Sequence, residues 1–209
     1  MAGIAIFGGS FNPVHNGHLH LALALEERFA FDRILMIPTN IPPHKPAHDL
    51  ATGEHRMAML RLAVEQYPFL VPDDRELRRE GKSYTVDTLR ELSREYPEQQ
   101  LFLLMGADML TSFTAWKDYR EITRLATLIA AGRTEEKDEL FGMERAADHL
   151  RSEGARVKIC DIPVLEIAST MLRKSARRGD DLREYTPVSV AEYIQAHQLY
   201  KGGEGESTR

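Results

Sequence analysis

Short apolar runs alternate with amphipathic stretches along almost the whole chain, and this alternation limits the folds that the sequence allows. The apolar runs are brief, continuous and closed by Gly or Pro, which is typical of strands buried on both faces of a sheet. They lie at 3–7, 33–38, 69–71, 101–106, 127–132 and 157–163. Stretches with helical periodicity lie between them, at 17–30, 53–66, 85–96 and 138–152. A repeated strand–helix–strand order predicts an α/β fold with a doubly wound parallel sheet and helices on both faces.

The chain has 209 residues, which suits one domain, since domains of about 100 to 200 residues are usual. We expect a single domain over 1–200 and a flexible C-terminal tail over 201–209, whose sequence KGGEGESTR is Gly-rich and polar. A last helix is predicted over 187–200, with Thr186 as its N-cap and Pro187 in its first turn.

The composition argues against several classes of protein. With 27 Lys+Arg against 32 Asp+Glu there is no general basic field for a nucleic acid, and no apolar run approaches the ~20 residues of a membrane span. The single cysteine, Cys160, forms no internal disulfide and no CxxC motif, which fits a reducing compartment. We therefore expect a cytoplasmic protein without nucleic-acid or membrane partners, and the sequence makes no prediction of its oligomeric state.

The segment IFGGSFNPVHNGHLHLA, residues 6–22, leads from the first predicted strand into a helix. In an open parallel sheet, ligands bind beyond the carboxyl ends of the strands, where helix amides attract anions. Gly8 and Gly9 leave the backbone open to a phosphate, and Ser10 adds a donor. The segment matches neither a Walker loop nor the GxGxxG pattern, so the glycines alone also allow a simple turn.

His15 and His18 follow at a spacing of three residues, which places both imidazoles on the same side of the helix start. Such a pair can stabilise charge on a phosphate, bind a metal, or serve as structural caps. A zinc site needs a third ligand, and His20 should point elsewhere.

The string from Gly8 to His18 resembles the H-x-G-H signature of the nucleotidyltransferases, and its flanks resemble bacterial nicotinate-nucleotide adenylyltransferases. The resemblance extends over about 3–200 and implies a Rossmann-like fold. It also implies transfer of AMP from ATP to nicotinate mononucleotide, giving nicotinate adenine dinucleotide and pyrophosphate in NAD biosynthesis.

The same resemblance suggests roles for residues along the chain. It places Gly8, Gly9, Ser10, Phe11 and the Lys45 of a Pro-rich loop at the triphosphate, with His44 a weaker candidate, and Gly106 and Asp108 at a nucleotide ribose. Trp116 is expected to stack on the pyridine ring. Thr85 and the backbone amides of Val86 and Lys117 are expected to hold the mononucleotide, including its carboxylate.

The segment IASTMLR, 167–173, corresponds to the family pattern I-S-S-T-x-I-R, except that Ala168 replaces the first serine. Ser169, Thr170 and Arg173 remain to bind phosphates, with His15, His18 and Arg173 as the catalytic residues. From the residues alone, Ser169 or Thr170 is expected to cap this helix, and Ser or Thr near 83–85 the helix over 85–96.

The expected reaction is direct attack of the acceptor phosphate on the α-phosphorus of ATP, which depends on alignment and on charge stabilisation. No carboxylate cage for a metal is visible, so we expect Mg²⁺ to arrive on the ATP phosphates. Three alternatives remain: a related transferase with another acceptor, such as pantetheine phosphate; a metal-dependent hydrolase; and a nucleotide sensor without activity.

Overall fold

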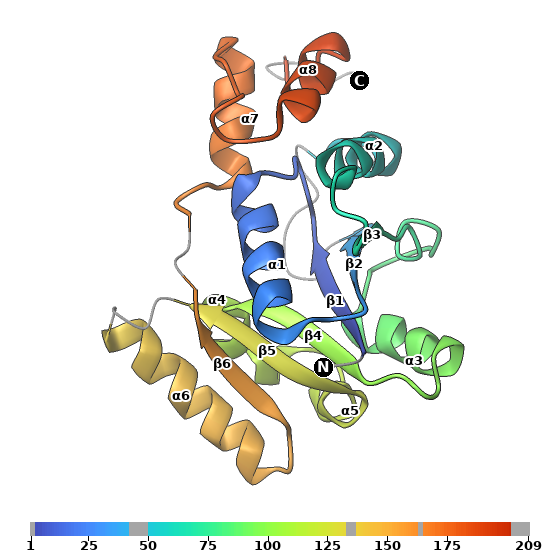
Figure 1. The fold of residues 1–209 in the computed structure, drawn as a ribbon, viewed down its shortest axis with the longest axis vertical. Helices are drawn as coiled ribbons and strands as arrows, with labels where there is room; N and C mark the ends of the chain where they lie inside the picture. The colour runs from blue at the N-terminus through green and yellow to red at the C-terminus, as the bar shows by residue number, and fades with distance from the viewer. Residues whose placement is uncertain (1–2, 42–49, 133–136, 163–164, 202–209) are drawn as a thin grey trace, which may run out of the picture.

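The structure is a computed structural model that describes residues 3–41, 50–132, 137–162 and 165–201. Within them, six strands form one sheet in the order β3-β2-β1-β4-β5-β6, and every pairing is parallel. The strands are β1 (Ile4–Gly9), β2 (Arg33–Pro38), β3 (Leu70–Pro72), β4 (Leu101–Gly106), β5 (Ala126–Gly132) and β6 (Val157–Asp161). The predicted Rossmann-like sheet is confirmed (Figure 1).

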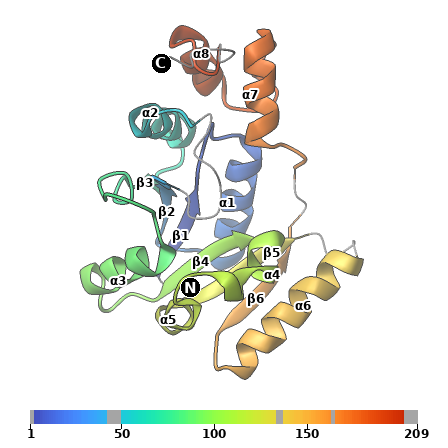
Figure 2. The same ribbon diagram turned by 180° about the vertical axis from the view of Figure 1, so that it is seen from behind.

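Alternate residues of each strand enter two separate cores, because successive side chains of a strand point to opposite faces. Ala5 and Phe7 of β1 pack on one face with helices α1 (Asn16–Phe29), α2 (Gly53–Val64), α7 (Ser169–Arg178) and α8 (Val188–Ala196). Ile4 and Ile6 pack on the other face with α3 (Thr85–Glu95), α5 (Tyr119–Leu125) and α6 (Lys137–Ser152). The sheet is therefore covered on both faces, as Figure 2 shows from behind.

The order of the strands creates a switch point at the carboxyl ends of β1 and β4. The chain proceeds from β1 to β2 and β3 on one side, then returns to β4 on the other side of β1. Crevices at such reversals are the usual ligand sites of open parallel sheets. The loop that leaves β1 and the loop that leaves β4 both begin at this point.

Helices α7 and α8 lie beside α2 and the start of α1, at the end of the molecule to which β1 points (Figures 1 and 2). Several contacts join this C-terminal part to the loop after β1. The Thr186 hydroxyl donates to the carbonyl of Val14 at 2.9 Å, and the Asn16 amide donates to the carbonyl of Tyr185 at 2.8 Å. The C-terminal part thus fixes the path of the chain from β1 into α1.

Thr186 does not cap the last helix as the sequence predicts, because its hydroxyl makes that contact with Val14. Pro187 occupies the N-cap position, and the helix ends at Ala196 rather than at residue 200 because Gln198 and Tyr200 adopt positive φ angles of 51° and 65°.

The sequence also missed the short helices α4 (Ala107–Thr111), η1 (Phe113–Ala115) and α5, which are too brief for a clear period. Residues 163 and 202–209, in the predicted last strand and tail, lie outside the described residues. None of the described helices is long and apolar enough to cross a membrane.

Candidate active site

The first part of the site is the carboxyl end of β1. A Cβ added to Gly8 would have no atom within 4 Å, so the backbone borders open space there, as a ligand approaching it requires. A Cβ on Gly9 would lie 3.2 Å from Cζ of Phe11. The side chain of Phe11 is fully buried and packs edge-on against the rings of Phe7 and His18. Phe11 therefore supports His18 from the core instead of lining a pocket.

His15 and His18 lie against each other, as their spacing predicts. Their rings stack with centroids 3.7 Å apart, and the His15 backbone amide donates to Nδ1 of His18 at 3.2 Å. Because Nδ1 of His18 accepts this bond, the neutral ring carries its proton on Nε2 and can donate it to a ligand.

Burial keeps both imidazoles neutral near pH 7. It lowers the pKa of His15 to about 4 from 6.5. Burial, and next the charge of His15, lower the pKa of His18 well below its ordinary value. In the absence of an anion the pair therefore acts as hydrogen-bonding groups, and a bound polyphosphate would favour their protonation.

Arg173 extends from α7 to the same loop. Its Nη1 donates to the carbonyl of Asn12 at 2.9 Å, and its Nη2 lies 3.4 Å from the hydroxyl of Thr170. Among the described residues, two buried side-chain atoms lack a hydrogen-bond partner: Nδ1 of His15 and Nε of Arg173. Buried polar atoms are nearly always paired, so two unpaired ones beside one loop indicate a ligand site.

Ser169 and Thr170 do not cap α7, contrary to the prediction. Ala168 holds the N-cap position and has no polar side chain that could cap the helix. The Ser169 hydroxyl instead donates to the carbonyl of Pro13 at 2.9 Å. The amides of the first turn of α7 thus have no side-chain cap and remain available to an anion.

Two buried side chains that the sequence did not predict support the loop after β1. Arg56 of α2 is 1% exposed, and its guanidinium donates to the carbonyls of Ser10, Thr39 and Ala51 at 2.9, 2.6 and 3.0 Å. The Tyr200 hydroxyl donates to Oδ1 of Asn12 at 2.8 Å. These contacts tie the ends of β1 and β2 to the C-terminal segment.

A pocket on the α3 side of β1, called the Trp116 pocket, is lined by several predicted residues. The lining residues are Ile6, Gly8, Gly9, Ser10, Thr39, Glu76, Ser83, Tyr84, Thr85, Thr88, Leu103, Leu104, Met109, Trp116, Lys117 and Ile122. The Lys117 ammonium lies 4.2 Å from the Tyr84 ring centroid and 3.8 Å from Oδ2 of Asp87, so this charge is engaged beside the pocket.

The α3 helix starts at this pocket without the cap that the sequence predicts. Tyr84 holds the N-cap position, because the Ser83 hydroxyl accepts a bond from the Asn40 amide at 3.0 Å. Val86 is fully buried in the core, so only its backbone amide is left for a ligand at this helix start. The sequence missed Glu76 and Thr88, which hydrogen bond to each other at 2.7 Å.

A second pocket, called the Gly106 pocket, lies beyond the ends of β4 and β5. It is lined by Gly17, His20, Leu21, Gly106, Ala107, Asp108, Ala131, Gly132, Glu139 and Ile162. Gly106 and Asp108 thus lie together at one pocket, as predicted, and His20 points to this pocket as its spacing from His18 suggests. Lys45 and His44, predicted near the phosphates, lie outside the described residues.

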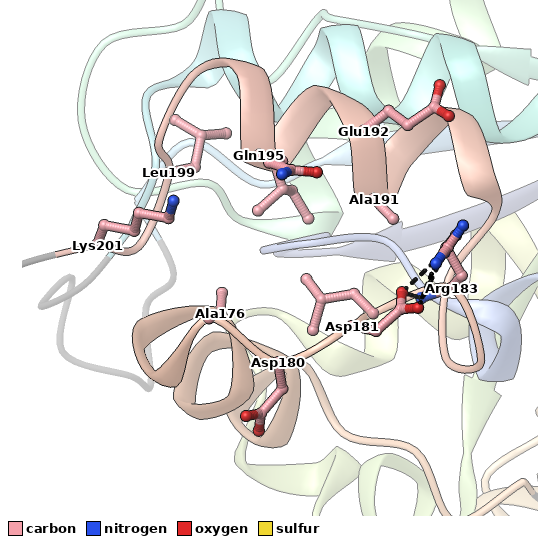
Figure 3. A pocket seen from close by; sticks show the side chains of 12 residues that line it. Ala176, Asp180, Asp181, Arg183, Ala191, Glu192, Gln195, Leu199 and Lys201 are labelled. Carbon is pink, nitrogen blue, oxygen red and sulfur yellow. Dashed lines mark hydrogen bonds and ion pairs between the residues drawn. The ribbon is translucent and has the colours of Figure 1, made fainter.

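A third cavity, of about 370 Å³, lies between α7 and α8 and shares no lining residue with either pocket (Figure 3). Its Asp181 and Arg183 side chains are bonded to each other at 2.6 Å. It exceeds the Gly106 pocket, of about 260 Å³, so size alone does not locate the site.

Comparison with known proteins identifies the family. The cytidylyltransferase-like family model matches residues 6–176. A probable nicotinate-nucleotide adenylyltransferase of Synechococcus sp. (strain JA-3-3Ab) is 39% identical, with 94% of each chain covered. This chain belongs to the nicotinate-nucleotide adenylyltransferases. A family member of Oceanobacillus iheyensis, also described as probable, is 36% identical over 97% of this chain and 99% of its own.

Solved structures agree on the fold of these adenylyltransferases. A nicotinic acid mononucleotide adenylyltransferase of Plasmodium falciparum, complexed with NaAD, matches with a TM-score of 0.75 at 18% identity, covering 96% of this chain and 98% of that one. The same Plasmodium enzyme complexed with APC matches with a TM-score of 0.72.

Proposed function

We propose how the residues of this chain carry out the reaction of its family, the transfer of AMP from ATP to nicotinate mononucleotide with release of pyrophosphate. The observation that supports the assignment is the convergence of the stacked His15–His18 pair, Arg173 and the start of α7, which has no side-chain cap, at the loop after β1. Hydrogen-bond donors and a positive charge gathered beside an open backbone suit a polyanion, because phosphate oxygens are acceptors.

The triphosphate of ATP lies across the loop after β1, between the Trp116 pocket and the Gly106 pocket. Gly8, Gly9 and Ser10 allow the phosphates to approach the backbone, while Ser169, Thr170 and the free amides of α7 bind oxygens from the other side. The Gly106 pocket takes the nucleoside part of ATP, with Asp108 near its ribose. Lys45 completes the phosphate contacts.

Nicotinate mononucleotide occupies the Trp116 pocket. Trp116 stacks on the ring, and Thr85 with the amides of Val86 and Lys117 binds the carboxylate at the start of α3 and before α5. This arrangement brings the acceptor phosphate to the loop after β1, in line with the α-phosphorus.

Catalysis then consists of alignment and charge stabilisation. The acceptor phosphate attacks the α-phosphorus directly and pyrophosphate leaves, so no protein nucleophile is needed. His18 donates from Nε2 to an α-phosphate oxygen, His15 assists it, and Arg173 neutralises the charge that develops on the leaving pyrophosphate.

The described residues contain no group of three His, Cys, Asp or Glu side chains that could hold a metal ion. We infer that Mg²⁺ is carried by ATP oxygens and water, since it usually keeps several waters and binds substrate phosphates. We also infer that the enzyme works in the cytoplasm as one domain with a C-terminal tail.

Pyrophosphate release from ATP, measured with a panel of acceptors, tests this proposal. The panel comprises nicotinate mononucleotide, nicotinamide mononucleotide, pantetheine phosphate and no acceptor. Two charge-assisted hydrogen bonds to the carboxylate should favour the acid over the amide by at least ~10-fold in kcat/KM. Equal use of the two mononucleotides would contradict the carboxylate contacts, and release only with pantetheine phosphate would contradict the acceptor itself.

A further inference from the structure

Glu76 is an acidic residue in a pocket assigned to an anionic substrate. It lines the Trp116 pocket and is only 6% exposed. A buried carboxylate normally has a cationic partner, because removing the charge from water is costly. Among the described residues, no Lys, Arg or His side chain forms an ion pair with Glu76.

Hydroxyl groups surround the carboxyl instead. The Thr88 hydroxyl donates to Oε1 at 2.7 Å, and the hydroxyl side chains of Ser83 and Thr39 lie close enough to lower the pKa of the carboxyl. Burial raises the pKa of Glu76, while these hydroxyls and the charge of Arg79 lower it in part. The hydroxyls therefore orient the carboxyl and offset part of the cost of burying its charge, but they supply no direct counter-ion.

The nearby cations are occupied elsewhere. Arg79 binds Oε2 of Glu91 at 2.6 Å and the Thr88 hydroxyl at 3.2 Å. Besides Glu76, the charged residue that lines this pocket is Lys117, and its ammonium lies against Tyr84 and Asp87. The described part of the pocket thus presents an aromatic ring and a buried carboxyl, and this pair suits a flat cation.

We propose that Glu76 is the counter-charge for the pyridinium ring of the acceptor and determines the preference of this enzyme for a positively charged ring. The inference rests on the proposed function, which places the acceptor in the Trp116 pocket. The ring nitrogen of nicotinate mononucleotide is quaternary and carries a permanent positive charge, so the ligand itself supplies the missing cation. The proposed function assigns the carboxylate of the same ring to the amides of Val86 and Lys117.

The test compares two acceptors that differ in ring charge. One is nicotinate mononucleotide; the other is its carbon-linked analogue, in which a carboxyphenyl ring replaces the carboxypyridinium ring. Both keep the carboxylate, the aromatic face and the phosphate. We expect the parent enzyme to have a KM about tenfold lower for the pyridinium acceptor, a typical size for one partly buried charge pair.

The Glu76→Gln variant keeps the size of the side chain and an oxygen that accepts from Thr88, but it loses the charge. It should raise the KM for nicotinate mononucleotide about tenfold while leaving the KM values for the analogue and for ATP unchanged. Glu91→Gln is the matched control, since it removes one negative charge from the same Arg79 cluster without lining the pocket. It should keep the preference of the parent.

Equal KM values for the two acceptors in the parent would overturn the inference, and that measurement stands even where Glu76→Gln does not fold. An equal rise for both acceptors in Glu76→Gln would also overturn it and leave Glu76 a structural part of the wall. Parent enzyme that turns over neither acceptor would overturn the proposed function together with this inference, whereas turnover without a preference would overturn the inference alone.

Discussion

The two sides of the β1 strand end differ in the charge that they present. The side toward α7 carries Arg173, the neutral histidine pair and the uncapped amides of a helix start. The side toward α3 presents Trp116, several hydroxyls and the buried carboxyl of Glu76. We propose that the first side binds phosphates and the second binds the acceptor ring. Substitutions on the first side should therefore change kcat, and substitutions on the second should change the KM for the acceptor.

The two sides are also held in place by different contacts. On the α7 side, the carbonyls of Asn12, Pro13 and Val14 accept bonds from side chains of the C-terminal part. On the α3 side, the Thr88 hydroxyl donates to the carboxyl of Glu76, and the hydroxyls of Ser83 and Thr39 lie near it. Contacts to backbone carbonyls therefore hold much of the loop after β1, whereas the pocket wall depends more on the identity of each side chain.

The largest expected effect is on the phosphate side. Replacing His18 by Ala removes a positioned donor and should lower kcat by ~10²-fold or more, with a much smaller change in the KM for ATP. Steady-state kinetics measure both constants. His149→Ala, on the exposed surface of α6, is the control and should behave as the parent. A lost affinity for ATP with kcat intact would assign His18 to ground-state binding.

Arg173→Lys keeps the positive charge but loses the planar fork that bonds the Asn12 carbonyl and that we propose to bind a phosphate. We expect kcat to fall by about tenfold or more, because one ammonium cannot replace bidentate contacts. Arg177→Lys, at an exposed position of the same helix, is the matched control. Activity near that of the parent would place Arg173 outside the catalytic machinery.

On the pocket side, Trp116→Ala should raise the KM for both pyridine mononucleotides by about tenfold, since a stacked aromatic pair contributes about 0.5 to 1.5 kcal/mol beyond its buried area. The KM for ATP should stay nearly constant. Phe141→Ala removes an exposed ring of α6 and serves as the control. An equal rise in the KM for ATP and in the KM for the acceptor would show that Trp116 does not act on the acceptor alone.

The smallest effect concerns stability and pH. The folded pKa of His15, about 4, lies below its unfolded value of 6.5, so the unfolded chain binds the proton first as the pH falls. The contribution of His15 is complete above pH 6.5 and is lost toward pH 4. Between pH 7.5 and 5.5 the parent should lose about 1 kcal/mol more unfolding free energy than His15→Asn, measured by denaturant titration. Parallel losses would show that His15 is not buried as a neutral ring.

The arrangement of the loop after β1 could be predicted from the sequence better than the arrangement of the Trp116 pocket, for a physical reason. Gly8, Gly9, His15 and His18 belong to one continuous segment, and a strand end followed by a helix fixes their relative positions locally. Trp116 and Thr85 were predicted through resemblance to the family. Glu76 belongs to a charged segment whose sequence is typical of an exposed loop. Its carboxyl is buried near the hydroxyls of Thr39, Ser83 and Thr88, which lie elsewhere in the chain.

The helix caps show the same limit. A Ser or Thr residue lies just before or at the start of each of the helices α3, α7 and α8. Local preference predicts that the hydroxyl of this residue caps the helix. Ser83, Ser169 and Thr186 instead bond to Asn40, Pro13 and Val14. Arg56 was missed as well, because α2 appears amphipathic in sequence and only the convergence of three loops buries its guanidinium. Tertiary contacts outweigh local preference at each of these positions.

We propose that the histidine pair donates hydrogen bonds to ATP and does not attack it. The most direct measurement follows the configuration at the α-phosphorus, using one diastereomer of an ATP in which sulfur replaces a non-bridging α-oxygen, with nicotinate mononucleotide as acceptor. A single in-line displacement predicts inversion of configuration in the dinucleotide product. Retention would contradict direct attack, because it requires two displacements and therefore an adenylyl group carried by the protein, with His15 or His18 as the nearest candidate to carry it.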